Sequence, residues 1–155
     1  MATTSASIPW GRIAQQGIVS GLVGGIVMML FLFATLYRML GGSILALWST
    51  DAANIHQTSP WIGLLAHLAV SVAWGLGYAY VANTRATILN RPWISGFFYG
   101  LIVWIIMQVV LMAGAVWNPA TLATYPLIIA LFAHAFFFGI PVALTTRAMS
   151  PSTQA

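Results

Sequence analysis

Two histidines lie inside long apolar segments of the chain. His67 and His134 end two similar motifs, Leu64-Leu-Ala-His67 and Leu131-Phe-Ala-His134, at an offset of 67 residues. An ionisable side chain at such a position is costly in a bilayer and is therefore a candidate functional residue. Imidazoles from two facing helices can bind haem iron, and one imidazole can bind chlorophyll magnesium. His67 and His134 are thus the candidate cofactor-binding residues, with haem or chlorophyll as the ligand.

A structural role is also open to the same pair. A neutral histidine can donate its ring N–H to a hydroxyl or carbonyl group of a neighbouring helix, which stabilises the bundle by about 1 kcal/mol. A duplicated segment would also carry its histidine along, so the repeated position does not by itself require a cofactor. We favour the structural role and keep tetrapyrrole ligation as the alternative.

The composition indicates an integral membrane protein. Of the 155 residues, 61% are apolar and 4% are charged. The runs without a charged residue comprise 25, 33 and 55 residues, and each exceeds the roughly 18 apolar residues that suggest a membrane span. The chain has no lysine and no cysteine, which excludes P-loops, Schiff bases, disulfides and iron–sulfur clusters. A single carboxylate side chain excludes paired-carboxylate catalysis, so we expect no enzymatic activity.

The apolar runs predict a single all-α domain over residues 1–155, a transmembrane four-helix bundle. A crossing of about 30 Å needs around 20 helical residues, so the longest run must fold back on itself. The predicted spans are about 16–37, 61–82, 93–117 and 125–146. Four spans place both termini on one side together with four arginines, whereas Arg38 lies on the other side. The positive-inside rule then makes both termini cytoplasmic in a cell inner membrane.

The external loop from Arg38 to Pro60 carries the remaining polar groups. Its segment Ile44–Trp48 is too short to cross the membrane and is predicted to lie along the outer surface as a turn of helix. We expect Asp51 to partner Arg38. Asp51 and His56 do not form a complete set of metal ligands, so we interpret this stretch as a solvated loop and predict no metal site.

An internal repeat is the strongest pattern in the sequence. Ser20-Gly21-x-x-x-Gly25 recurs as Ser95-Gly96-x-x-x-Gly100 at an offset of 75 residues. Together with the repeated histidine motifs, this pattern predicts two helical hairpins in parallel orientation, related by an axis along the membrane normal. Gly21, Gly25, Gly96 and Gly100 are the predicted helix-packing residues, because glycines one turn apart let two backbones approach closely in lipid.

Methionines continue the same helix faces. Met28 follows the first pair of glycines and Met107 the second. Unbranched thioethers adapt to irregular gaps, so we interpret them as packing residues. A metal-transport role for Met28, Met107 and Met112 is the alternative.

The order of these features resembles that of small four-helix bacterial inner-membrane proteins of the YagU-like kind. The shared order is a helix rich in small residues, a helix with a leading His67 and a trailing Tyr78, a glycine-rich helix and a final helix with His134. The resemblance implies a four-helix inner-membrane protein to which no catalytic residue can be assigned.

Three functions fit the sequence. The first is a non-enzymatic accessory or structural subunit that packs, among lipids, against other membrane subunits of a larger complex. The second is a haem- or chlorophyll-binding module ligated by His67 and His134. The third is a small oligomeric transporter in which the last helix bends at Pro141. Nucleic acid is not an expected partner, because five scattered arginines form no basic patch.

Overall fold

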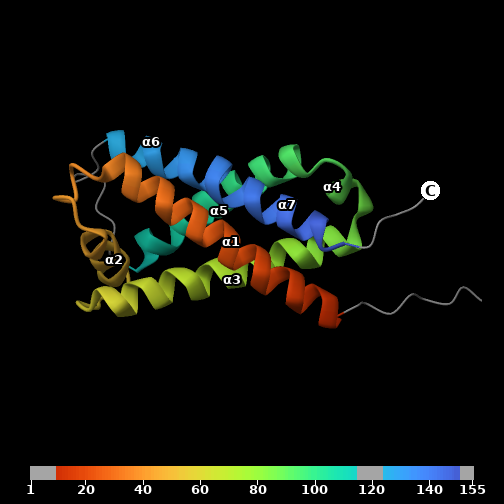
Figure 1. The fold of residues 1–155 in the computed structure, drawn as a ribbon, viewed down its shortest axis with the longest axis horizontal. Coiled ribbons are helices and arrows are strands. Elements are labelled where there is room, and N and C mark those ends of the chain that lie inside the picture. The colour runs from red at the N-terminus through yellow and green to blue at the C-terminus, as the bar shows by residue number, and fades with distance from the viewer. Residues whose placement is uncertain (1–9, 115–123, 151–155) are drawn as a thin grey trace, which may run out of the picture.

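The described part of the chain is a bundle of helices (Figure 1). The computed structural model describes residues 10–114 and 124–150. Within these ranges the regular elements are α1 (Trp10–Leu36), α2 (Ile44–Ala53), α3 (Pro60–Thr84), α4 (Ala86–Asn90), α5 (Pro92–Ala113), α6 (Thr124–Phe132), η2 (Ala133–Gly139) and α7 (Ile140–Ala148). The π-helix η2 joins α6 to α7 without a break, so these three elements form one long rod.

Four helices are long and apolar enough to cross a membrane, which confirms the predicted fold class. They are Trp10–Leu36, Pro60–Thr84, Pro92–Ala113 and Leu127–Ala148. The first begins six residues before the predicted Gln16. The predicted end of the third span, Trp117, lies outside the described residues.

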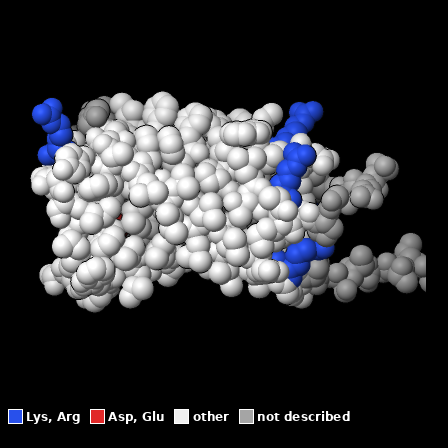
Figure 2. Space-filling view, in the orientation of Figure 1, with Lys and Arg blue, Asp and Glu red and all other residues white. Residues whose placement is uncertain are grey.

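The two described ends of the chain lie at the same end of the bundle (Figure 1). Arginines gather there, while a single arginine marks the opposite end (Figure 2). Arg12 lies in the first turn of α1, Arg85 and Arg91 flank α4, and Arg147 lies in the last turn of α7. Arg38 follows the end of α1. The bundle has an arginine-rich end and an arginine-poor end, which we call the inner and outer ends.

The connection at the outer end contains the predicted surface helix. Gly41 and Gly42 have positive φ angles of 62° and 76°, which glycine adopts without steric cost. They end the turn after α1, and α2 then runs from Ile44 to Ala53, beside the first turns of α3 (Figure 1). The helix is longer than the predicted Ile44–Trp48 segment. It fits closely because Gly63 of α3 lies against the carbonyl of Trp48.

A glycine seam joins α1 to α3. A Cβ atom added to Gly21 would collide with the backbone of Ser71, and one added to Gly75 would collide with the carbonyl of Gly17. The side chain of Ser71 lies over Gly25 in the same way. Dispersion contacts of this kind replace the hydrophobic drive that a helix pair has in water. Gly21 and Gly25 therefore pack helices together, as predicted.

A second glycine seam joins α5 to the last rod. A Cβ atom at Gly100 would collide with the carbonyl of His134, one at Gly96 would meet the carbonyl of Gly139, and one at Gly139 would collide with that of Gly96. The two seams use the same Ser-Gly-x-x-x-Gly pattern, one in each predicted hairpin. A duplication of the hairpin stays a prediction.

The last rod departs from α-helical geometry over the seven residues of η2. Pro141 follows directly in the first turn of α7 and has no N–H, so the carbonyl of Phe137 lacks its ordinary α-helical donor. The next N–H along the chain belongs to Val142, five residues after Phe137, and this spacing is that of a π-helix. The segment before Pro141 is therefore π-helical and contains His134, while a bend at Pro141 stays a prediction.

Packed side chains fill the bundle from its middle toward the inner end. This core comprises Met28, Tyr78, Ala82, Val103, Ala133, Phe138, Val142 and Ala143. Two tyrosines link α3 to α5 there: Tyr99 donates to the carbonyl of Trp74, and the Tyr78 hydroxyl hydrogen-bonds to Ser95 at 2.8 Å. These hydrogen bonds hold the two helices together between Trp74 and the inner end of the bundle.

A methyl group added at the second seam should destabilise the bundle. We expect Gly100→Ala to cost about 1–3 kcal/mol, because its Cβ meets backbone that cannot move aside. Gly11→Ala is the matched control, since no atom lies within 4 Å of the added Cβ, and alanine in a helix is favoured by up to about 1 kcal/mol. Thermal unfolding of the purified variants in detergent measures the difference. Equal melting temperatures for the two variants would show that the seam is not tightly packed.

Candidate functional site

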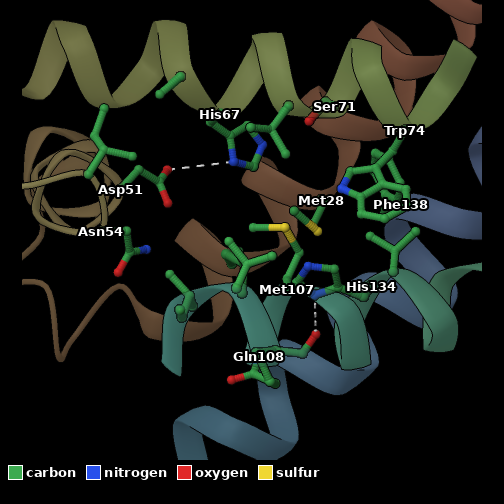
Figure 3. Close-up of a pocket in the computed structure, with 18 residues that line it drawn as sticks. Met28, Asp51, Asn54, His67, Ser71, Trp74, Met107, Gln108, His134 and Phe138 are labelled. Carbon is green, nitrogen blue, oxygen red and sulfur yellow. Dashed lines mark hydrogen bonds and ion pairs between the residues drawn. The ribbon is translucent and has the colours of Figure 1, made fainter. Parts of the chain in front are cut away.

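The polar side chains of the outer half surround one cavity (Figure 3). It has a volume of about 370 Å³ and lies between α3 and α5, with walls from α1, α2 and the last rod. Both predicted site residues, His67 and His134, line it. The remaining polar lining residues are Asp51, Asn54, Ser71 and Gln108. Residues from five elements, far apart in the sequence, are thus brought together around a single space.

His67 is fixed by contacts on both ring nitrogens. Its Nε2 lies 3.1 Å from the carbonyl oxygen of Gly25, and because a carbonyl can only accept, Nε2 carries the proton. Its Nδ1 lies 3.6 Å from Oδ2 of Asp51 (Figure 3). The bond to Gly25 is the interhelical contact expected of a structural histidine, and the close approach of α1 to α3 brings the two groups within reach.

Asp51 does not pair with Arg38 as the sequence analysis expected. The side chain turns inward from α2 and faces His67 instead, and only 25% of it is exposed. Burial raises the pKa of Asp51 from 3.8 to about 6, while the nearby His67 acts in the opposite direction. The expectation of a fully solvated loop was wrong for this residue, because α2 docks against α3 and carries Asp51 over the cavity.

His134 has a different arrangement. Its Nδ1 lies 2.7 Å from the carbonyl oxygen of Ala130 in its own helix, so Nδ1 carries the proton and Nε2 keeps its lone pair. Figure 3 shows the ring turned toward the middle of the cavity, where Met28 and Met107 also point. A histidine held through its other ring nitrogen in this way is oriented as metal-binding histidines commonly are.

The other polar residues of the outer half have separate roles. Asp51 and His56 do not come together: Nε2 of His56 lies 3.2 Å from the carbonyl of Gly114 and ties the loop after α2 to the end of α5. Gln108 lines the cavity. Within residues 10–114 and 124–150, no group of three or more His, Cys, Asp or Glu side chains could hold a metal ion.

Sequence reasoning missed a polar cluster at the inner end. Gln16 is fully buried, accepts a hydrogen bond from Asn83 at 2.7 Å and donates to Ser150 at 2.9 Å. The cluster fastens α1 to α3 and to the end of the last rod. A polar residue at the edge of an apolar run gives no signal that distinguishes a buried amide from one exposed at the membrane surface.

A comparison with protein-family models gives a match over residues 12–155, to a family of unknown function, DUF6789. The chain belongs to the DUF6789 family. No curated protein and no solved structure matches the chain. The match covers both hairpins and the whole cavity of this DUF6789 member, so the family comprises the complete bundle and not one hairpin of it.

The two histidines of this DUF6789 protein differ in the polar contacts of their ring nitrogens. Both ring nitrogens of His67 already face polar partners, whereas Nε2 of His134 takes no part in the bond to Ala130. A tetrapyrrole held between them would first have to break the contacts of His67. Ligation of haem or chlorophyll by the pair stays a prediction, and the arrangement is better suited to a ligand bound by His134.

The titration of Asp51 can be measured directly, because it is the only acidic side chain in the sequence. We expect its carboxylic C=O infrared band to disappear with a midpoint near pH 6, well above the C-terminal carboxyl, which titrates at about 3.3–3.7. The folded protein holds this proton up to about pH 6 and the unfolded chain releases it near 3.8. Stability should therefore fall as the pH rises between these values.

Asp51→Asn is the control for the infrared titration. The variant should lack the band, and its stability should change less with pH in this range. A midpoint at or below pH 4 in the unmodified protein would show that Asp51 is solvated rather than buried against His67.

Proposed function

We propose that this protein is a non-enzymatic accessory subunit of the cell inner membrane, and that it binds a small ligand in the outer half of its bundle. The single observation that carries the proposal is the cavity. His67, His134 and Asp51 converge on it, although lipid would disfavour each of these side chains on the bundle surface. A volume of about 370 Å³ falls within the range of small-molecule sites.

The shape of the cavity favours binding over transport. Among the described residues, its lining extends inward to Trp74, Val103 and Phe138. Val103 and Phe138 belong to the packed core, which continues inward to Tyr78, Ala82 and Ala143. A blind space with an apolar floor supports a binding site, whereas a conducting pathway would need polar groups at both ends. The oligomeric transporter is the weaker candidate for this reason.

The outward surface supports an accessory role. α5 is the least covered of the four spans: 17% of its most apolar window is buried, against 39% for α1. Large apolar side chains follow one another along its free face, namely Ile94, Phe98, Ile102, Ile105 and Val109. Such a face suits lipid and also the helix of another membrane subunit. We also propose, on the resemblance described above, that the chain is related to the YagU-like inner-membrane proteins.

The distribution of arginines supports an orientation with both termini in the cytoplasm. Four arginines at the inner end against one at the outer end is the bias that the positive-inside rule associates with the cytoplasmic side. The cavity would then lie toward the external face of the membrane.

Single cysteines test this orientation cleanly, because the chain has none of its own. Ser49→Cys in α2 and Thr87→Cys in α4 both replace exposed residues. We expect a membrane-impermeant maleimide to label Ser49→Cys in intact cells, and Thr87→Cys only after the membrane is opened. The reverse pattern would invert the topology.

Native mass spectrometry of protein released from its own membranes in mild detergent tests the ligand and the partner together. We expect the unmodified protein to retain a small ligand and a second protein subunit. Ala66→Phe fills the cavity and should lose the ligand, whereas Ala69→Phe, an exposed position of the same helix, should keep it. An isolated chain without either companion would contradict the proposal.

A further inference from the structure

Two thioethers and one imidazole meet in the middle of the cavity. Met28 comes from α1, Met107 from α5 and His134 from η2, and all three line the same space. Figure 3 shows their sulfur and nitrogen atoms pointing toward one another. We infer that Met28, Met107 and His134 form a binding site for a soft monovalent metal ion, Cu(I). The inference rests on the proposed function, because it names the ligand of that cavity.

The imidazole of His134 is already oriented for binding a metal ion. Its Nδ1–H is held by the carbonyl of Ala130 at 2.7 Å, which fixes the tautomer and leaves the Nε2 lone pair for a metal. The π-helical turn in which His134 lies is a feature often found at functional sites. The carbonyl of His134 packs closely against Gly100, and this contact restricts movement of the backbone that carries the ring.

The donor atoms select the ion. Thioether sulfur is a soft ligand and favours Cu(I), while calcium and magnesium require several oxygen ligands. Structural zinc sites use cysteine, histidine or carboxylate, and the chain has no cysteine. Apolar side chains, Val103 and Phe138, close the space around the three donors and disfavour a hydrated divalent ion.

The charge of the cavity suits a cation. All three donors are neutral, and the only acidic side chain of the protein, Asp51, lines the same space. No arginine is among the lining residues, and the titratable lining side chains other than Asp51 are the donor His134 and His67, whose Nδ1 lies 3.6 Å from Asp51. Asp51 can balance that ion without binding it directly.

The methionines of the chain are not equivalent. Met28 is buried and belongs to the core, and Met107 packs against that core. Met29 is engaged elsewhere, because its sulfur accepts a hydrogen bond from the Trp48 indole at 3.1 Å. Met112, which the sequence grouped with Met28 and Met107, is 45% exposed and does not line the cavity. It is therefore a natural control.

The test measures Cu(I) binding by the full chain in lipid nanodiscs, without oxygen, in competition with a chromophoric Cu(I) chelator. We expect one ion per chain and an X-ray absorption spectrum with two sulfur ligands and one nitrogen ligand. Met28→Leu and Met107→Leu conserve side-chain volume, so the bundle should fold. Each should weaken binding by roughly 10- to 100-fold or more, as should His134→Asn.

Met112→Leu should bind as tightly as the unmodified protein. Circular dichroism of every variant separates loss of a ligand from loss of the fold. Absence of stoichiometric Cu(I), or equal affinity in the Met28→Leu and Met112→Leu variants, would overturn the inference. If Ala66→Phe still displaced an organic ligand in that case, the proposed cavity function would stand and only the metal assignment would fall.

Discussion

The close approach of backbones at the glycine seams is the constraint on which the rest of this structure depends. In lipid, two apolar helices gain nothing by leaving solvent, so they associate through contact and through interhelical hydrogen bonds. Gly21 and Gly75 bring α1 and α3 together, and Gly100 and Gly139 do the same for α5 and the last rod. The bond from His67 to the carbonyl of Gly25 is available only because α1 lies so near.

The cavity follows from this pattern of contacts. Each seam fastens one helix pair, and tyrosine hydrogen bonds join α3 to α5 in the inner half. Nothing equivalent among the described residues joins α3 to α5 at the outer end, where α2 lies over the opening and supplies Asp51. Tight packing at the two seams and in the core thus leaves a polar space at a defined place, between the outer halves of α3 and α5.

Much of the architecture could be predicted from the sequence, because length and apolarity determine spans in a bilayer. The four spans, the surface helix after α1 and the packing role of Gly21, Gly25, Gly96 and Gly100 were predicted and are present. His67 and His134, the candidate site residues of the sequence analysis, both line one interior space.

The details of the site could not be predicted, since they depend on tertiary contacts. Asp51 was assigned to Arg38, a neighbour in the loop, because nothing in the sequence shows that α2 turns the carboxyl toward α3. The tautomers of the two histidines depend on which carbonyl each ring reaches. The π-helix before Pro141 was not predicted; the sequence analysis expected only a bend at the proline.

The glycine seams also govern how this sequence can diverge. An outward position such as Leu65 or Phe98 is exposed on the surface of the bundle, so one apolar side chain can replace another there at little cost. A seam position has no such freedom, because a single added carbon must displace a facing backbone. Distant descendants of the same ancestor should therefore differ most on their lipid-facing ridges and least along two narrow stripes of small residues.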